Sequence, residues 1–136
     1  MNGDLNKQRL EACGIRPTRQ RVALAGILFA QEQHLSAERL MRLAREQGVR
    51  VSKATVYNTL NLFARQGLVR EVLVDPARVF YDSNVSQHHH FYNVETGELT
   101  DVPADSVSFE RLPGLPDGTQ PDGVDVIIRV RGHSYA

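Results

Sequence analysis

The chain has 136 residues, of which 41% are hydrophobic and 24% charged, with equal numbers of basic and acidic side chains. This length suits one ordinary domain or two small ones, and no apolar run approaches the roughly 20 residues that span a bilayer. The N-terminal stretch mixes charged and apolar residues, unlike a secretory signal, so the cytoplasm is the default compartment. Cys13 is the sole cysteine of the sequence, which excludes an internal disulfide and any zinc site built from paired Cys-x-x-Cys motifs.

The net charge of zero hides a division between the two halves of the chain. Residues 1–82 hold 13 Lys/Arg and 8 Asp/Glu, a net charge of +5, whereas residues 83–136 hold 3 and 8, a net charge of −5. This imbalance predicts a basic domain over residues 1–82 that binds a polyanion, and a second, acidic domain over residues 83–136.

The first half has the periodicity of helices. Apolar residues at helical spacing and short glycine-containing breaks predict four helical segments, within residues 6–14, 16–33, 35–48 and 51–67. Pro17 lies near the start of the second segment, and Ser36 and Ser52 are suited to cap the first turns of the third and fourth.

The period then changes to that of strands. Residues 68–74 and 78–82 alternate or run apolar, and the turn Asp75–Ala77 joins them. Helices followed by a two-stranded hairpin are the plan of a winged helix-turn-helix domain, which binds duplex DNA.

The second half reads as a small α/β domain after a linker near residues 82–87. Strands are predicted over residues 88–94 and 98–102, a short helix over 103–112, a loop over 113–123 and a strand over 124–132. Such a domain is too small to bury a sheet face alone, so pairing with a second copy is expected. The predicted fold class is therefore α+β, with a winged helix followed by a dimerisation domain.

The fourth predicted helix presents polar side chains that could contact DNA in a major groove. Its candidates are Lys53, Thr55, Tyr57, Asn58 and Asn61. Basic side chains at the start of the second helix could neutralise phosphates, namely Arg16, Arg19 and Arg21. For any one of these residues a merely solvated helix face is an equally good interpretation, and the combination is more specific than its parts.

Three of the five histidines are consecutive, at His88, His89 and His90. On a strand, residues two apart face the same side, so His88 and His90 can reach one ion while His89 points away. Imidazole nitrogens suit iron, zinc and manganese. The alternatives are a plain exposed strand and a haem contact.

Four stretches occur in the order found in the ferric uptake regulator family: "RPTRQRVALAGIL", "HLSAERL", "VSKATVYNTLNLFARQGLV" and "HHHFYN". The chain resembles that family over roughly residues 14–102. Within the family its sequence is most similar to the iron response regulator branch, whose members respond to haem as well as to metal. The resemblance implies an N-terminal winged helix, a C-terminal dimerisation domain and operator DNA binding that a metal controls.

The resemblance also implies a regulatory metal site with ligands from both halves of the chain. The matching positions are His34, Asp82, His88, His90 and Asp101. Three imidazoles and two carboxylates favour Fe(II) or Mn(II), with zinc as a common occupant of purified protein. An ion held by both halves would set the angle between the two domains.

Several positions depart from the family pattern. Asn93 and Thr96 stand where many members have Cys-x-x-Cys, so a Cys-based structural zinc is not expected. Gln87 and Ser108 stand at two expected positions of a further family site, whose last histidine cannot be placed. Asp125 is nearby, and His133 in the tail is a weak candidate. The Cys-Pro haem motif of some relatives is missing at Cys13, so haem would need His88, His89 or His90 as its ligand.

The leading hypothesis is an iron-responsive transcription regulator of the repressor type. It would bind an inverted-repeat operator as a homodimer, without membrane contact or enzymatic activity, under control of metal or haem. Whether the ligand promotes or releases DNA binding stays open. A peroxide sensor of the same family is one alternative, because Asp101 has a shorter arm than the glutamate of many members. A His/Asp metalloenzyme is the other.

Overall fold

The structure is a computed structural model that describes residues 2–75 and 77–132. Pro76 of the predicted turn and the tail candidate His133 lie outside the described residues. The chain divides into two compact units, with the boundary between Val85 and Ser86. No helix in the described part of the chain is long and apolar enough to cross a membrane.

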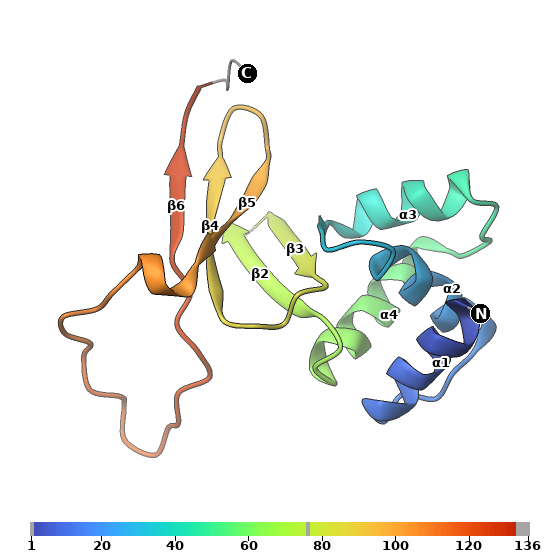
Figure 1. Ribbon diagram of the computed structural model, residues 1–136, viewed down its shortest axis with the longest axis horizontal. Coiled ribbons are helices and arrows are strands. Elements are labelled where there is room, and N and C mark those ends of the chain that lie inside the picture. Colours follow the sequence, from blue (N-terminus) through green and yellow to red (C-terminus); the bar gives the residue numbers. More distant parts are fainter. Residues whose placement is uncertain (1, 76, 133–136) are drawn as a thin grey trace. The chain divides into compact units, whose positions relative to one another are not determined.

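The first unit contains the four predicted helices (Figure 1), which are α1 Asn2–Ala12, α2 Arg19–Leu28, α3 Ala37–Glu46 and α4 Lys53–Arg65. Ser36 and Ser52 cap α3 and α4 as predicted, because their side chains accept the backbone N–H of the third residue that follows. Thr18 caps α2 in the same way, so this helix begins two residues after Pro17.

The helices pack through one apolar core. Side chains from every helix contribute, and those that are 0% exposed include Leu10, Leu24, Leu28, Leu40, Leu60 and Phe63. Burial of each such leucine or phenylalanine stabilises the fold by about 1.5–3 kcal/mol. This core holds α2 and α4 in a fixed relation, which matters because both carry the candidate DNA contacts.

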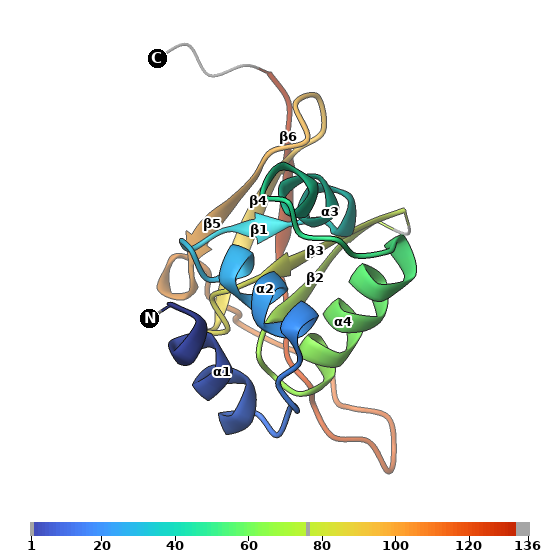
Figure 2. The ribbon, with the colours of Figure 1, turned by 90° about the vertical axis from the view of Figure 1, so that its right-hand side faces the viewer.

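The hairpin of the first unit consists of β2 Arg70–Asp75 and β3 Arg78–Asp82, which pair antiparallel as predicted. A third strand that the sequence did not indicate, β1 His34–Leu35, lies on the other side of β3 and directly precedes α3 (Figure 2). Two residues are too few to show an alternating pattern, so only the pairing with β3 reveals this strand.

The second unit is a three-stranded sheet of β4 His88–Asn93, β5 Leu99–Pro103 and β6 Ile127–Val130, in the order β5-β4-β6. β4 pairs antiparallel with β5 and parallel with β6. Gly97 supplies the positive φ of 77° in the turn between β4 and β5. Together the two units confirm the α+β fold class.

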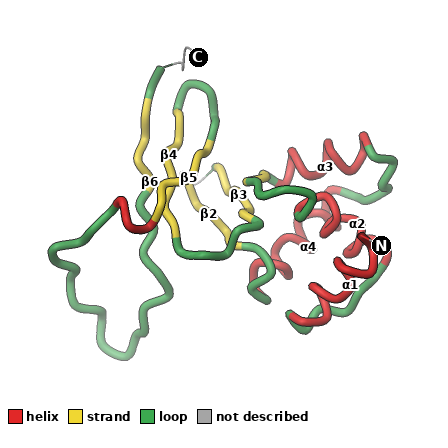
Figure 3. The backbone as a smooth tube through the Cα atoms, in the orientation of Figure 1, coloured by secondary structure: helices red, strands yellow, loops and turns green. Residues whose placement is uncertain are grey.

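The predicted helix over residues 103–112 is wrong. One 3₁₀ turn, Ala104–Ser106, is present, and residues 107–126 form neither helix nor strand (Figure 3). Residues 103–112 are all exposed or half-buried, including the apolar side chains Phe109 and Leu112, so a helix here would bury no apolar face, and packing of such a face supplies most of the stability of a short helix. The last strand is also shorter than the predicted 124–132.

Candidate metal centre and DNA-binding face

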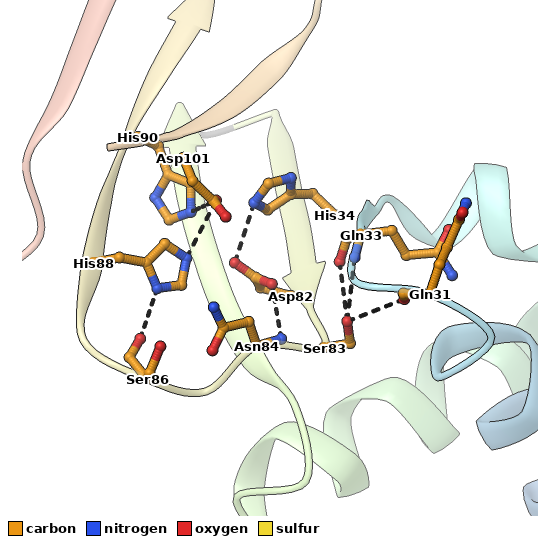
Figure 4. Close-up of polar contacts among 10 residues, drawn as sticks. All are labelled: Gln31, Gln33, His34, Asp82, Ser83, Asn84, Ser86, His88, His90 and Asp101. Atoms are coloured by element: carbon orange, nitrogen blue, oxygen red, sulfur yellow. Dashed lines mark hydrogen bonds and ion pairs between the residues drawn. The ribbon is translucent and has the colours of Figure 1, made fainter. Parts of the chain in front are cut away.

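His34 and Asp82 form a pair within the first unit (Figure 4). They are opposite residues of β1 and β3, and His34 Nε2 lies 3.1 Å from Asp82 Oδ2. The other carboxylate oxygen, Oδ1, accepts the backbone N–H of Asn84 at 2.9 Å. That bond fixes the orientation of the carboxylate, so one oxygen of Asp82 and one nitrogen of His34 point toward the same place.

His88, His90 and Asp101 converge within the second unit. The two histidines lie on the same side of β4, with ring centroids 4.6 Å apart, and Asp101 is the β5 partner of His90. Asp101 Oδ1 lies 3.3 Å from His88 Nε2 and 3.5 Å from His90 Nε2. Each of the three side chains therefore offers a donor atom to one point, which is the arrangement that a transition metal requires.

The hydrogen bonds of His88 assign the tautomer of its ring. Nδ1 lies 2.6 Å from the backbone carbonyl oxygen of Ser86, and a carbonyl can only accept, so Nδ1 carries the proton (Figure 4). In the neutral ring the lone pair is then on Nε2, the nitrogen that faces Asp101. Metal-ligating histidines are oriented by a bond of this kind at the other nitrogen, so the residues present fit a metal ion.

His89 lies on the opposite side of β4 and has a structural role. Its Nδ1 accepts the backbone N–H of Val126 at 3.0 Å, and its ring meets the Phe109 ring edge-on with centroids 6.1 Å apart. These contacts attach the irregular segment before β6 to β4. Because His89 is engaged there and His88 and His90 face Asp101, the geometry does not favour the haem alternative.

The position of the absent cysteine pair is occupied by an amide network. Asn93 Oδ1 accepts the backbone N–H groups of Glu95 and Thr96, and Asn93 Nδ2 donates to the carbonyl of Gly132 at 2.7 Å. One amide side chain thus connects the β4–β5 turn with the second residue after β6, and these positions offer no thiolate to zinc. Gln87, at a position of the further family site, likewise donates to the backbone carbonyl of Val124.

The candidate DNA contacts lie along α4 and at the start of α2. Lys53, Asn58 and Asn61 are exposed, as are Arg16 and Arg19. Half-buried side chains on the same elements complete the candidate set, namely Arg21, Thr55 and Tyr57. The structure brings part of this set together in a groove lined by Thr18, Gln20, Arg21, Thr55, Asn58, Thr59 and Leu62.

Three polar residues near this groove were not predicted from the sequence. A neighbouring cavity is lined by Gln20, Arg45 and Arg50 together with Ser52 and Thr55, and Gln20 Nε2 donates to the Arg50 carbonyl at 3.3 Å. The sequence does contain an indication of a phosphate contact here, because Arg45 and Arg50 lie on either side of Gly48, shortly before the capped helix α4.

Glu38 also contacts a predicted DNA-binding residue. The Tyr57 hydroxyl on α4 donates to Glu38 Oε1 at the start of α3, and the Lys53 ammonium lies 6.0 Å from the centroid of the Tyr57 ring. The hydrogen bond, with burial second, raises the pKa of the Tyr57 phenol, and the same bond lowers the pKa of the Glu38 carboxyl. The pair holds the Tyr57 ring in one orientation on α4.

Comparison with known proteins agrees with this architecture. The model of the ferric uptake regulator family matches residues 12–111. The ferric uptake regulation protein of Neisseria meningitidis is 30% identical over 98 residues, covering 71% of this chain and 68% of the relative. The peroxide-responsive repressor PerR of Staphylococcus aureus is 29% identical over 68% of this chain and 62% of its own length.

Solved structures show the same fold. The ferric uptake regulator of Pseudomonas aeruginosa with manganese has a TM-score of 0.72 at 26% identity, covering 96% of this chain and 99% of that one. The ferric uptake regulator of Francisella tularensis with iron has a TM-score of 0.70 at 20% identity. These relatives are transcription regulators rather than enzymes, which removes the support for a metalloenzyme, and they do not single out the iron response regulator branch. The chain belongs to the ferric uptake regulator family of DNA-binding, metal-responsive transcription regulators.

Proposed function

We propose that the protein is an iron- or manganese-responsive transcription repressor that binds inverted-repeat operator DNA as a homodimer. The observation that carries the proposal is the convergence of His88 Nε2 and His90 Nε2 on one oxygen of Asp101, with the His88 tautomer set by Ser86. Family membership supplies the DNA-binding context.

His34 and Asp82 complete the proposed ligand set. Two donors from the first unit or three from the second are fewer than the about six ligands that Mn(II) and Fe(II) favour, whereas three imidazoles and two carboxylates come close. The ferric uptake regulator of Pseudomonas aeruginosa, solved with manganese, supports that metal here. Zinc is a further candidate, since imidazole also suits it.

A shared ligand set explains how a metal would control DNA binding. Residues of both units that hold one ion restrict the relative angle of the units, and so raise the fraction of dimers whose winged helices suit two half-sites. A ligand shifts such an equilibrium only by its differential affinity for the two states. On this basis metal promotes operator binding, and its removal releases the DNA.

The reading helix of the proposed complex is α4. Lys53, Thr55, Tyr57, Asn58 and Asn61 would lie in the major groove, with Arg16, Arg19 and Arg21 at backbone phosphates. Asparagine is suited to adenine, since its amide can form two hydrogen bonds with the N6/N7 edge.

The experiment has two stages. Duplexes selected by the protein from a random library in the presence of Mn(II) identify the operator, and fluorescence anisotropy at near-physiological salt then measures affinity with Mn(II), with Fe(II) under anaerobic conditions and with chelator. We expect at least about tenfold tighter binding with metal, within the usual range of coupling between sites. Equal affinity with and without metal would contradict the proposal.

A peroxide sensor is the second candidate, because a peroxide-responsive repressor is among the relatives. Its test is mass spectrometry of the Fe(II)-loaded protein after hydrogen peroxide, with the Mn(II)-loaded protein as the control. Addition of one oxygen to His34 or His90 in the iron sample alone would favour this candidate over the simple metal-responsive repressor. Unmodified peptides would eliminate it.

A further inference from the structure

Gln33 and Ser83 are the immediate neighbours of the first-unit ligands His34 and Asp82 (Figure 4). The Ser83 backbone N–H donates to the Gln33 carbonyl, and the Gln33 backbone N–H donates to Ser83 Oγ, both at 3.2 Å. The position of the Gln33 backbone is therefore fixed to the same strand pair that aligns His34 with Asp82.

The side chain of Gln33 points elsewhere, to the end of α2. Its Nε2 donates to the carbonyls of Ile27 at 2.7 Å and Leu28 at 3.1 Å. These belong to the last turn of the helix, where carbonyl groups lack the usual N–H donor four residues on, although the Ile27 carbonyl also accepts the Ala30 N–H at 3.5 Å. Gln33 thus caps α2 with a side-chain donor while its backbone belongs to the metal-ligand strands.

The backbone between the end of α2 and Gln33 has no regular secondary structure that would transmit a displacement. Residues 29–32 form a turn and a series of bends, and Ala30, Gln31 and Glu32 are exposed. The Gln33 amide crosses this segment directly. α2 is a ten-residue helix about 15 Å long, and its first turn carries Arg19 and Arg21, so a displacement at Ile27 and Leu28 moves the proposed phosphate contacts.

We propose that Gln33 is a positioning residue that couples metal binding at His34 and Asp82 to the placement of α2 on DNA; this inference rests on the proposed function. Coordination by both ligands would set the separation of β1 and β3 at this residue pair. The Gln33 backbone follows that separation through Ser83, and its amide transfers the change to the last carbonyls of α2. Contiguous hydrogen-bonded contacts of this kind can carry coupling between sites.

The test is the substitution Gln33→Met, which keeps the length of the side chain and removes the donor. Three quantities are measured: Mn(II) affinity by calorimetry, operator affinity with chelator, and operator affinity with saturating Mn(II). We expect the first two to stay within about threefold of the parent protein and the metal-induced gain in DNA affinity to fall at least about fivefold. Gln31→Met is the matched control, because the Gln31 side chain is exposed and Ser83 contacts the Gln31 backbone carbonyl, which the substitution retains; its gain is expected to equal that of the parent.

A second variant tests the hydrogen bond itself. Gln33→Lys retains N–H donors toward the end of α2, where a cation is also favourable, so we expect it to keep most of the metal-induced gain. An undiminished gain in Gln33→Met would overturn the inference, as would equal losses in both Gln33 variants. A uniform loss of DNA affinity with and without metal would show a purely structural role and would also overturn it. If the parent protein itself shows no metal-induced gain, the proposed function fails first, and the two failures are thereby distinguished.

Discussion

His88 and Asp101 lie on neighbouring strands of the second unit, with His88 Nε2 3.3 Å from Asp101 Oδ1. The same oxygen lies 3.5 Å from His90 Nε2, so one carboxylate serves two imidazoles. A carboxylate oxygen that faces two imidazole nitrogens, one of them in a ring whose Nδ1 donates to the Ser86 carbonyl, is suited to share a bound cation with those rings.

Asp101→Asn is expected to weaken Mn(II) binding at least about tenfold, because a neutral amide replaces a charged ligand. Calorimetry measures the affinity, and circular dichroism checks that the fold is intact. Asp105→Asn, an exposed residue of the adjoining 3₁₀ turn, is the matched control and is expected to bind like the parent protein. Equal affinities in the two variants would remove Asp101 from the ligand set.

Arg19→Ala is expected to weaken binding to specific and non-specific duplexes alike, because a phosphate contact carries no sequence information. The slope of log affinity against log salt should decrease by about 1, the value for one lost phosphate contact. Arg111→Ala, which removes an exposed arginine of the second unit, is the control. An unchanged slope in Arg19→Ala would place that side chain away from the DNA.

Glu38→Ala is expected to lower the pKa of Tyr57 toward the ordinary value of a phenol, because the hydrogen bond that raises it is removed. Absorbance of the phenolate near 295 nm follows the titration, and the same titration of Tyr57→Phe assigns the signal among the tyrosines. Glu46→Ala, another exposed carboxylate of α3, should leave the curve unchanged. Titration of Tyr57 at the parent pH in Glu38→Ala would contradict the contact.

The same contact has a defined pH window. The folded-state pKa of Glu38 is lowered, so its contribution to stability is present above the unfolded pKa and is lost as pH falls through the folded pKa. The pKa of Tyr57 is raised, so its contribution is present below the unfolded pKa and is lost as pH rises through the folded pKa. Parent and Glu38→Ala should therefore differ most in unfolding free energy between these limits, measured by urea titration at several pH values, and should converge in acid.

Asn93→Ala is expected to destabilise the second unit by about 1–3 kcal/mol, because the amide makes three hydrogen bonds to backbone groups. Urea unfolding measures the loss, and Asn58→Ala on the exposed face of α4 is the control, with an effect expected within about 0.5 kcal/mol. An Asn93→Ala variant as stable as this control would show that the amide network does not hold the turn.

Addition of haem to the operator complex is expected to leave DNA affinity unchanged, because His89 is engaged by Val126 and Phe109, and His88 and His90 face Asp101. Fluorescence anisotropy measures the DNA affinity, and the Soret absorbance band measures haem binding. Release of DNA together with a Soret shift that His89→Ala, His88→Ala or His90→Ala abolishes would restore the haem alternative.

Much of this architecture was predictable because the signals are local. Helical spacing, together with caps such as Ser36 and Ser52, marks α2, α3 and α4, and alternation marks β2 and β3. These patterns reflect hydrogen bonds and burial within a few residues, which any short window of the chain contains. The placement of His88 and His90 on one side of β4 follows from the same short-range rule.

Contacts between distant residues were not predictable in this way. The two-residue strand β1 exists only by pairing with β3, some fifty positions later. The segment 103–112 departs from the expected helix, and none of its side chains is buried to stabilise one. The Tyr57–Glu38 bond, the Gln33 cap on α2 and the bond from Val126 to His89 likewise join elements whose approach no local pattern encodes. The spacing of side chains along the chain therefore specified the helices, the strands and the candidate metal ligands. Long-range packing determined which of those ligands face one another, because their approach depends on strand register and on the core rather than on neighbours in sequence.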